Sequence, residues 1–338
     1  MNNSSHATNV PIPKGWTRGV STTRNRPYYY HRESRHTQWH FPTPSEASDP
    51  VGSKQRMAAE RHNKKRKMLN SVAIIVPYRD LHPSQNRAKH LHQFIPHMKM
   101  FLDDLIASNK IQDYHIYIIE QSDDHRKFNR GKLLNIGFNF ALKRSEKHPP
   151  RHNVFIFHDV DLLPQSDLGD WYARFPTRPT HIARVWDRYS NNQKYFGGIV
   201  SFSEDDMMRI NGYPNTFWGW GGEDDEMQKR LETLNIKWDA PDKGTIVDLE
   251  DMDLTAKLGF LKKNKEWKCM VKWEALEEHE QTWKANGLSD LSYDILKITR
   301  LDKDDGGESK ATKLTTDVKL NGNHWANEKC GVDYLPQG

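Results

Sequence analysis

Short apolar segments alternate with longer amphipathic ones through the middle of the chain. Residues 72–76, 114–119 and 154–157 are rich in β-branched and aromatic side chains, whereas residues 88–106 and 132–142 have the spacing of a half-buried helix. This alternation predicts βαβ units in a parallel sheet, which binds its ligands at the carboxyl ends of the strands. The expected fold class is therefore α/β, with helices flanking the sheet.

Two carboxylates stand at the end of the third predicted strand. Asp159 and Asp161 follow the apolar run, and a second acidic cluster occurs at residues 223–226, directly after Trp218-Gly-Trp-Gly-Gly222. Carboxylate oxygens suit a hard divalent cation, which is most useful beside a diphosphate. The pattern predicts a metal-assisted enzyme with a nucleotide-linked substrate, although acidic pairs at strand ends are often only solvated. No GxGxxG or Walker motif follows the first strand, which excludes dinucleotide-binding and P-loop folds.

Composition limits the environment and the partners. Cys269 and Cys330 are the two cysteines and lie in no metal-binding pattern, so neither a disulfide framework nor a structural zinc site is expected. The N-terminus has no apolar signal region, and the chain contains no run of about 18 apolar residues, the length needed to span a membrane. We therefore expect a cytoplasmic protein, in host or viral cytosol. The net charge of +5, with both signs interspersed, does not predict a nucleic-acid surface.

Residues 9–44 resemble a WW domain, a small three-stranded all-β module. The resemblance rests on Pro13-Lys-Gly-Trp16, Arg26-Pro-Tyr-Tyr-Tyr30, Thr37-Gln-Trp39 and Pro42. It implies that Trp16, Tyr29 and Pro42 form a structural buckle. It also implies that Tyr28 and Trp39 line a groove for a proline-rich peptide or protein in the polyproline II conformation.

The ligand class of this module stays open. Arg32 stands where many WW domains have a histidine that reads a ligand tyrosine. Arg18, Arg24 and Arg26 in the first loop favour a phosphorylated ligand or form a solvated basic loop. Residues 45–70 then read as a basic linker, with Lys64-Lys-Arg-Lys67 as a possible nuclear-localisation or polyanion-binding patch.

Four segments between residues 71 and 302 resemble the catalytic domain of the inverting β-1,4-galactosyltransferases, which have the GT-A fold. The resemblance implies a GT-A type mixed sheet that binds a nucleotide sugar, and it leaves residues 303–338 as a C-terminal tail. The segments are Ile75-Val-Pro-Tyr-Arg79, Phe128-Asn-Arg-Gly-Lys-Leu-Leu-Asn-Ile-Gly137, His158-Asp-Val-Asp-Leu-Leu-Pro164, and Tyr195-Phe-Gly-Gly198 leading to Trp218-Gly-Trp-Gly-Gly-Glu-Asp-Asp225.

The family resemblance implies transfer of galactose from UDP-galactose to a sugar hydroxyl. Asp224 would be the catalytic base, and Glu223 and Asp225 would position the hydroxyls of donor and acceptor. Adjacent carboxylates repel one another, which predicts a raised pKa for one of them. An acidic helix N-terminus that matches the helix dipole explains the same residues without catalysis, but not the Trp-Gly segment before them.

The resemblance also implies a Mn²⁺ or Mg²⁺ cofactor. Asp161 would bind the metal, and Asp159 would lie near the ribose or beside the metal. Relatives supply further ligands from a Met/His or His-x-His segment, but residues 248–253 read Asp-Leu-Glu-Asp-Met-Asp. Glu250 or Asp251 is the expected second ligand, which would favour harder ions. A solvated acidic loop is the alternative.

Substrate contacts are expected from cations and aromatic residues. Relatives often have a second arginine two positions after Arg79, where this chain has Leu81. Tyr195 would favour galactose over N-acetylgalactosamine, Trp220 would close over the sugar, and Trp273 would lie near an acceptor ending in N-acetylglucosamine or xylose. The complete predicted binding set is Pro77, Arg79, Phe128, Arg130, Lys132, Asp159, Arg188, Tyr195, Gly198, Trp220, Asp225 and Trp273.

Two other functions fit parts of the pattern. A glycoside hydrolase would also use paired carboxylates, but it needs neither a metal nor arginines for phosphate. A catalytically weak or inactive transferase fold that acts through its WW domain would explain the missing histidine ligand and Leu81. Metal-dependent UDP binding separates these possibilities.

Overall fold

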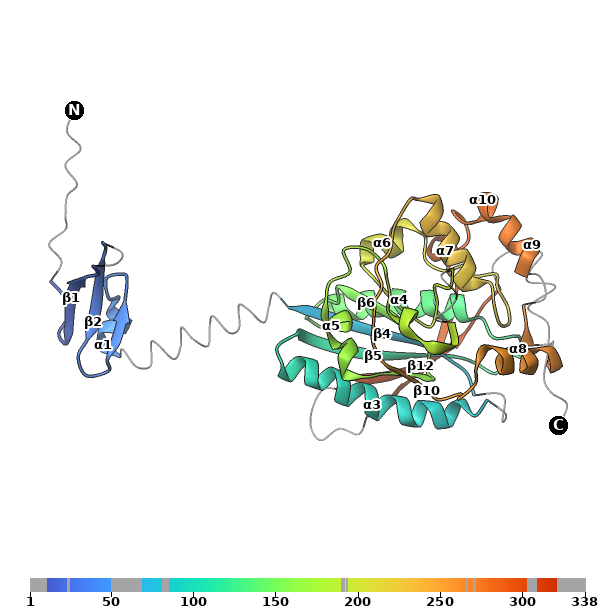
Figure 1. Ribbon diagram of the computed structural model, residues 1–338, viewed down its shortest axis with the longest axis horizontal. Coiled ribbons are helices and arrows are strands. Elements are labelled where there is room, and N and C mark those ends of the chain that lie inside the picture. The colour runs from blue at the N-terminus through green and yellow to red at the C-terminus, as the bar shows by residue number, and fades with distance from the viewer. Residues whose placement is uncertain are drawn as a thin grey trace, which may run out of the picture. The chain divides into compact units, whose positions relative to one another are not determined.

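The computed structural model describes residues 11–22, 25–49, 69–80, 85–189, 192, 194–264, 267–269, 272–302 and 309–320. The chain divides into two compact units, Met1–Met68 and Leu69–Gly338. Figure 1 shows both units. Most of the predicted linker, and the basic patch within it, lies outside the described residues.

The first unit is the predicted three-stranded antiparallel sheet. Its strands are β1 (Trp16–Val20), β2 (Pro27–His31) and β3 (His36–Gln38), with β2 in the middle. The short helix α1 (Pro44–Ser48) follows and has a capping box between Thr43 and Glu46. Burial acts to raise the pKa of Glu46, but hydrogen bonds from Thr43, His40 and Gln38 lower it to about 2. The ionised Glu46 thereby ties α1 to the sheet.

The second unit is built on a seven-stranded mixed sheet, which confirms the predicted fold class. The strand order is β11-β12-β5-β4-β6-β9-β8, and the pairs from β12 to β6 are parallel. The strands are β4 (Asn70–Tyr78), β5 (Ile111–Gln121), β6 (Val154–His158), β8 (Thr180–His181), β9 (Ile199–Phe202), β11 (Asp294–Arg300) and β12 (Ala311–Asp317).

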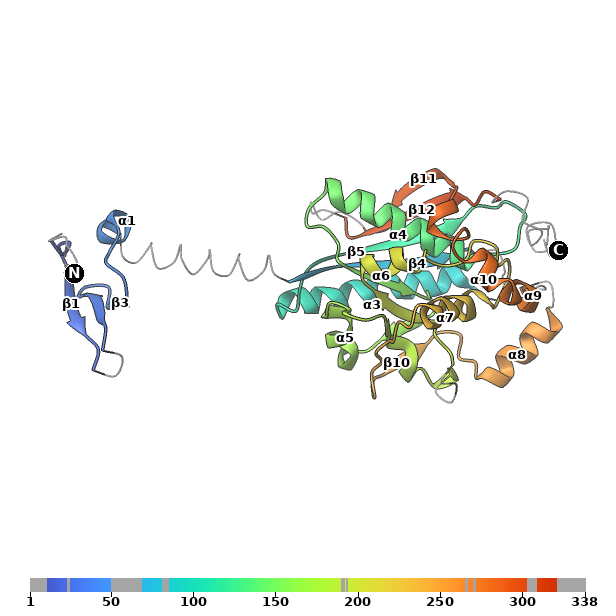
Figure 2. The same ribbon diagram turned by 90° about the horizontal axis from the view of Figure 1, so that it is seen from above.

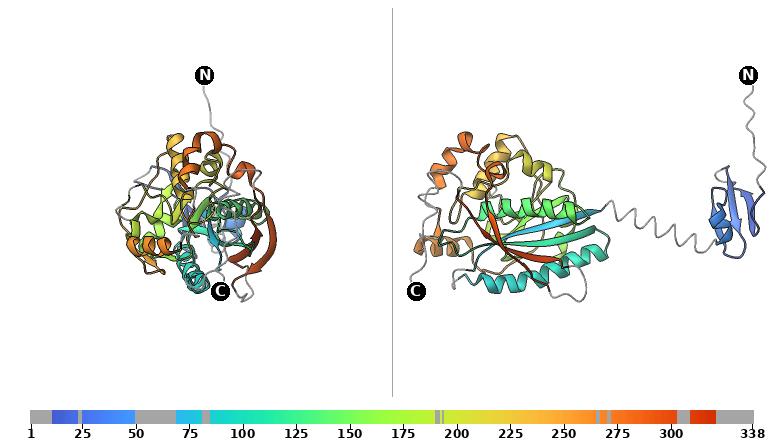
Figure 3. Two further views of the ribbon diagram at one scale, coloured as in Figure 1. Left: turned by 90° about the vertical axis from the view of Figure 1, so that its right-hand side faces the viewer. Right: turned by 180° about the vertical axis from the view of Figure 1, so that it is seen from behind.

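Helices α3 (Arg87–Ala107) and α4 (Arg130–Lys147) cover opposite faces of the sheet (Figure 3). The reason lies in β4, where Ile74 belongs to the core cluster under α3 and Ile75 to the cluster under α4. A Cβ at Gly137 of α4 would lie 2.3 Å from Ile75 Cγ2, so this glycine lets the helix approach the sheet closely.

The remaining elements lie in the connections between the strands of the main sheet. The short strands β7 (Leu162–Pro164) and β10 (Ile246–Asp248) pair antiparallel and bring two distant acidic segments together. The helices are α5 (Gly169–Ala173), α6 (Glu204–Arg209), α7 (Glu223–Thr233), α8 (Leu254–Lys263), α9 (Lys272–Glu277) and α10 (His279–Thr282). Single turns of 3-10 helix occur at Ser166–Leu168, Ile182–Val185, Asp187–Tyr189 and Leu288–Asp290.

The predicted boundary at residue 302 is wrong for part of the tail. Residues 311–317 form β12, which pairs parallel with β5, and β11 lies outside it at the edge of the sheet (Figure 2). The strand reads Ala-Thr-Lys-Leu-Thr-Thr-Asp, which has little apolar signal. Lys313 and Thr315 instead contact Glu120 on β5, at 2.8 and 2.6 Å.

Among the described residues, no helix is long and apolar enough to cross a membrane.

Buried histidines predict acid sensitivity. Burial lowers the pKa values of His152, His158 and His181 to about 4 each, below the ordinary value near 6.5. Between pH 6.5 and 4 the unfolded chain therefore binds more protons than the folded one, so the free energy of unfolding falls as the pH falls. We expect a lower melting temperature at pH 5 than at pH 7.5 in calorimetry. An unchanged melting temperature would contradict this assignment.

Candidate active site

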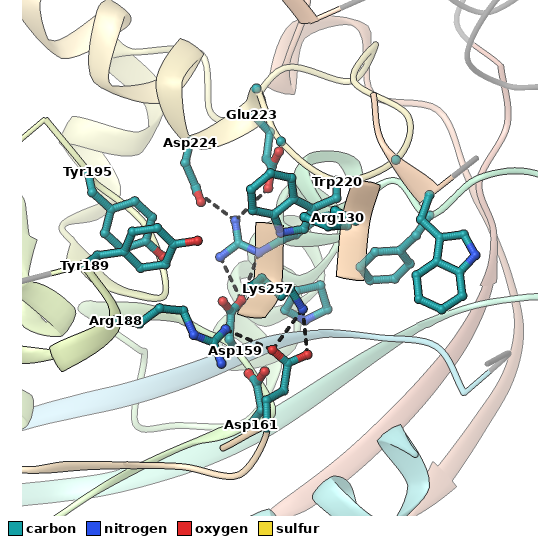
Figure 4. A pocket seen from close by; sticks show the side chains of 18 of the residues that line it. Arg130, Asp159, Asp161, Arg188, Tyr189, Tyr195, Trp220, Glu223, Asp224 and Lys257 are labelled. Atoms are coloured by element: carbon teal, nitrogen blue, oxygen red, sulfur yellow. Dashed lines mark hydrogen bonds and ion pairs between the residues drawn. The ribbon is translucent and has the colours of Figure 1, made fainter. Parts of the chain in front are cut away.

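A pocket of about 430 Å³ lies at the carboxyl ends of β4 and β6. This is the end of the sheet at which the sequence predicted ligand binding. Figure 4 shows how acidic, basic and aromatic side chains converge on it. The predicted site residues that line the pocket are Pro77, Arg79, Phe128, Arg130, Asp159, Asp161, Arg188, Tyr195, Trp220, Glu223, Asp224, Asp225 and Glu250.

Arg130 links the two acidic motifs. It is the first residue of α4, which Asn129 caps by accepting a hydrogen bond from the backbone N–H of Lys132. The Arg130 guanidinium donates to Asp159 Oδ1 at 2.9 Å and to Asp224 Oδ1 at 2.8 Å, and it lies 3.4 Å from Glu223 (Figure 4). One cation thus fixes the end of β6 against the start of α7.

Asp224 is held at the start of α7 with little freedom. The preceding loop has positive φ at Gly219, Gly221 and Gly222, a conformation that favours glycine. A Cβ at Gly197 would lie 2.1 Å from Asp224 Oδ2, so the absence of a side chain at Gly197 makes room for the carboxylate. Burial raises the pKa of Asp224 well above its ordinary value, against the opposing effect of Arg130. A raised pKa makes the deprotonated carboxylate a stronger base toward a hydroxyl proton.

A second group of charges lies at the junction of β7 and β10. The backbone N–H of Leu249 donates to the carbonyl oxygen of Asp161 at 2.8 Å, which sets Glu250 beside Asp161. Arg87, the first residue of α3, then bridges both carboxylates, at 2.7 Å to Asp161 and 2.6 Å to Glu250. We call the complete set the carboxylate–cation cluster; its members are Asp161, Asp248, Glu250, Arg87, Arg188 and Lys257.

The donor atoms of this cluster suit a divalent cation. Asp161 and Glu250 offer carboxylate oxygens, the ligands that Mg²⁺ and Mn²⁺ prefer. The Arg87 guanidinium lies between them, however, and in the described part of the chain no three His, Cys, Asp or Glu side chains converge as metal ligands. Asp251, the other predicted candidate, is exposed and does not line the pocket.

Aromatic side chains form another part of the wall. Tyr195 stacks on Tyr189 with ring centroids 4.0 Å apart, and burial raises the pKa of the Tyr195 hydroxyl well above its usual range. Trp220 is 39% exposed at the mouth of the pocket, whereas Trp218 is fully buried in the core. Of the two tryptophans, only Trp220 is placed to cover a ligand.

Three predicted binding residues do not line the pocket. Lys132 is fully buried and donates from Nζ to the carbonyl oxygen of Lys319, because the third residue of α4 faces away from the side that carries Arg130. Gly198 lies behind the wall, where its carbonyl oxygen accepts from the Asp159 backbone N–H at 2.9 Å. Trp273 is 71% exposed, with Lys272 over its ring at 4.9 Å.

Sequence reasoning missed several residues that line the pocket. The second arginine was expected two positions after Arg79, where this chain has Leu81, a residue outside the described ones. Arg87 instead stands eight positions after Arg79. Lys257 donates to both oxygens of Glu250, at 2.7 and 2.8 Å, and Lys272 pairs with Asp225 at 2.6 Å. No sequence motif marks these lysines, but the excess of acids in the predicted site implied cations to balance them.

Two family profiles match most of the second unit. The profile for the N-terminal region of glycosyl transferase group 7 matches residues 47–173, and that for the N-terminal domain of galactosyltransferase matches residues 177–255. The chain belongs to the β-1,4-galactosyltransferase family. This confirms the family predicted from the four sequence segments.

Sequence similarity to known relatives covers most of this galactosyltransferase-family chain. It is 34% identical to mouse β-1,4-galactosyltransferase 4 over 75% of this chain and 66% of the relative. It is 33% identical to the human protein of that name over 69% and 61%, and 30% identical to bovine β-1,4-galactosyltransferase 1 over 74% and 54%. The matches thus span less than two thirds of the length of these relatives.

Solved structures show the same fold. The catalytic domain of Drosophila β-1,4-galactosyltransferase 7, solved in complex with xylobiose, superposes with a TM-score of 0.55 at 26% identity, over 75% of this chain and 96% of that one. A mutant of that enzyme in complex with manganese, UDP-Gal and xylobiose superposes with a TM-score of 0.56 at 24% identity, over the same shares of the two chains. The predicted GT-A fold is confirmed.

Loss of Arg130 should destabilise the second unit. Arg130→Met would leave Asp159, Asp224 and Glu223 without their shared cation, at an expected cost of about 3 kcal/mol. Urea denaturation at pH 7.5 would measure the free energy of unfolding. The control Lys110→Met breaks the exposed pair with Asp170 and should cost about 1 kcal/mol or less. Equal losses in the two variants would contradict the central position of Arg130.

Proposed function

We propose that this protein transfers galactose from UDP-galactose to the hydroxyl of an acceptor sugar with inversion. The observation that carries the proposal is the pair of acidic motifs that Arg130 joins at one pocket, with Asp224 on one side and Asp159 on the other. The family membership supports the same conclusion. The pocket places cations and a candidate base within one space, as transfer from a nucleotide sugar requires.

The donor would lie along the cationic side of the pocket. Arg79 is fixed there by Asp124 at 3.3 Å and by the carbonyl oxygen of Arg126 at 2.8 Å, so its guanidinium is positioned before a ligand binds. Arg188, which also lines the pocket, is held by Glu250 at 2.9 Å. Tyr195, stacked on Tyr189, would limit the space beside the donor sugar, which favours galactose.

A divalent cation, Mn²⁺ or Mg²⁺, would be held by Asp161 and Glu250. Manganese accompanies UDP-Gal in the solved Drosophila relative. When bound, such a cation neutralises the charge that develops on a departing diphosphate. The residues of this chain would orient the donor and exclude water around it.

Asp224 would act as the base. Its carboxylate would take the proton of the acceptor hydroxyl while the hydroxyl oxygen bonds to C1 of galactose and the bond from C1 to UDP breaks. Arg130 keeps Asp224 oriented at 2.8 Å. Trp220, partly exposed at the mouth, would cover the sugar and reduce hydrolysis of the donor.

The acceptor sugar can be proposed from the solved relatives. Drosophila β-1,4-galactosyltransferase 7 was solved with xylobiose, which supports an acceptor that ends in xylose; one that ends in N-acetylglucosamine is the other candidate. A screen of both sugar classes with UDP-galactose would decide between them.

We also propose a cytoplasmic location on sequence composition alone, which fractionation of expressing cells would test.

The donor site can be tested by calorimetric titration of UDP and UDP-galactose with and without Mn²⁺. The proposed function requires metal-dependent binding that the Asp161→Ala variant lacks. Release of galactose from galactosides without nucleotide would instead indicate a glycoside hydrolase. Absence of UDP binding under every condition would indicate an inactive transferase fold.

Replacement of Asp224 should greatly slow galactose transfer but leave binding of the nucleotide intact. We expect Asp224→Asn to lower kcat by roughly 10²- to 10⁴-fold while UDP binding persists. Because the base must be deprotonated and its pKa is raised, the wild-type rate should fall as the pH falls, at a higher pH than for an ordinary carboxylate. A kcat within a few-fold of wild type would exclude Asp224 as the base.

Gly197→Ala, whose Cβ would meet Asp224, should also lose activity, whereas Gly259→Ala in open space should not.

The first unit has an aromatic surface that fits a proline-rich ligand. Tyr28 and Trp39 pack edge to face with ring centroids 6.2 Å apart, and Trp39 is 38% exposed. Trp16 is 7% exposed and contacts His31 at 5.4 Å between ring centroids, so it serves the sheet and not a ligand. We propose that this unit is a WW module that binds proline-rich segments between Tyr28 and Trp39.

Trp39→Ala should abolish binding of proline-rich peptides. The substitution removes an exposed ring from one side of the proposed groove and leaves the buried Trp16 in place. Fluorescence titration with a panel of proline-rich peptides, phosphorylated and not, would measure binding. Val20→Ala, at a 60% exposed position of the same sheet, is the control and should bind as wild type does. Peptide binding that survives Trp39→Ala would locate the ligand elsewhere.

A further inference from the structure

We propose that Arg87 occupies the place of the divalent cation in the free donor site and must leave Asp161 and Glu250 before that cation binds. The inference rests on the proposed function and adds a step to it. It gives Arg87 two alternating partners: the carboxylates before the cation binds and the nucleotide diphosphate afterwards.

The geometry of the contacts is that of a shared cation. Nη1 of Arg87 donates to Asp161 Oδ2 at 2.7 Å, and Nη2 donates to Glu250 Oε1 at 2.6 Å. One planar guanidinium therefore spans two carboxylates from separate segments, as a bridging metal ion would. These are the two residues whose oxygens suit a hard cation.

The charges of the carboxylate–cation cluster already balance. Three carboxylates face three cationic side chains, and the side chains of Glu250 and Asp161 are only 5% and 8% exposed. A divalent cation added between Asp161 and Glu250 would lie against the Arg87 guanidinium. Repulsion between like charges at such a separation is strong where solvent is largely excluded. Binding of the metal and the present position of Arg87 are therefore mutually exclusive.

Arg87 is the member of the cluster that can move. Arg188 is 4% exposed, donates to the carbonyl oxygen of Met252 at 2.8 Å and lies over the Trp186 ring at 4.6 Å. Lys257 is 5% exposed and contacts both oxygens of Glu250. Arg87 is 17% exposed and lines the pocket. If it turns toward the pocket, the metal would take its place at Asp161 and Glu250, and Arg188 and Lys257 would keep their contacts with Glu250.

This exchange predicts coupling between metal and nucleotide. A guanidinium released from Asp161 and Glu250 can form charge-assisted hydrogen bonds with a diphosphate. UDP would then pull Arg87 away from the metal site and tighten metal binding, and the metal would tighten UDP binding by the same factor. The same residue would thus weaken the binding of metal alone and strengthen the joint binding of metal and nucleotide.

The proposal is tested by titrating Mn²⁺ alone into the full chain. Electron paramagnetic resonance of the free ion would measure how much Mn²⁺ is bound. We expect Arg87→Gln to bind Mn²⁺ at least tenfold more tightly than wild type. Lys89→Gln removes the same charge from an exposed position on the same helix and should bind as wild type does. In a second arm with UDP present, the tightening of Mn²⁺ binding should be smaller in Arg87→Gln than in wild type.

Several outcomes would overturn the proposal. Equal or weaker Mn²⁺ binding by Arg87→Gln, in a protein whose wild type binds UDP with Mn²⁺, would refute the exchange and leave the proposed function standing. Absence of UDP binding by wild type at every Mn²⁺ concentration would instead refute the proposed function itself. If Arg87→Gln does not fold, Arg87→Met replaces it: methionine keeps a long unbranched side chain but carries no charge, so the Mn²⁺ affinity of this variant must exceed that of wild type.

Discussion

The guanidinium of Arg130 is the contact on which the site depends, because it is where three separate parts of the chain meet. It stands at the start of α4 and binds the carboxylate that ends β6 and the carboxylates that begin α7. Without it, Asp159, Glu223 and Asp224 would repel one another in a largely buried space. Glycines on two sides, Gly197 and the loop before α7, supply the room that this arrangement needs.

Sequence reasoning succeeded where local pattern determines structure. The alternation of short apolar runs with amphipathic segments predicted a sheet flanked by helices, and in the structure the residues of β4 alternate between two core clusters. The acidic motifs were found because Asp159 and Asp224 lie in short segments with unusual neighbours. The family followed from these segments, and the end of the sheet that carries the pocket followed from the predicted βαβ units.

What escaped prediction depends on contacts between distant residues. Lys132 lies only two positions from Arg130, yet the turn of the helix directs it to Lys319 and away from the pocket. Arg87 and Lys257 carry no motif and gain meaning only because β7 and β10 pair. The strand β12 was missed for the same reason, since its polar side chains are satisfied by Glu120 rather than by a hydrophobic pattern of their own.

The pairing of β12 with β5 also constrains how this domain is made. Lys313 and Glu120 are partners across 193 positions of sequence, so the edge of β5 cannot be covered while the ribosome is still adding the residues between them. During that interval an apolar strand with open backbone groups is available to other chains. Closure over so long a loop is slow. The yield of soluble protein should therefore depend on the chaperones that meet the nascent chain as much as on the stability of the finished fold.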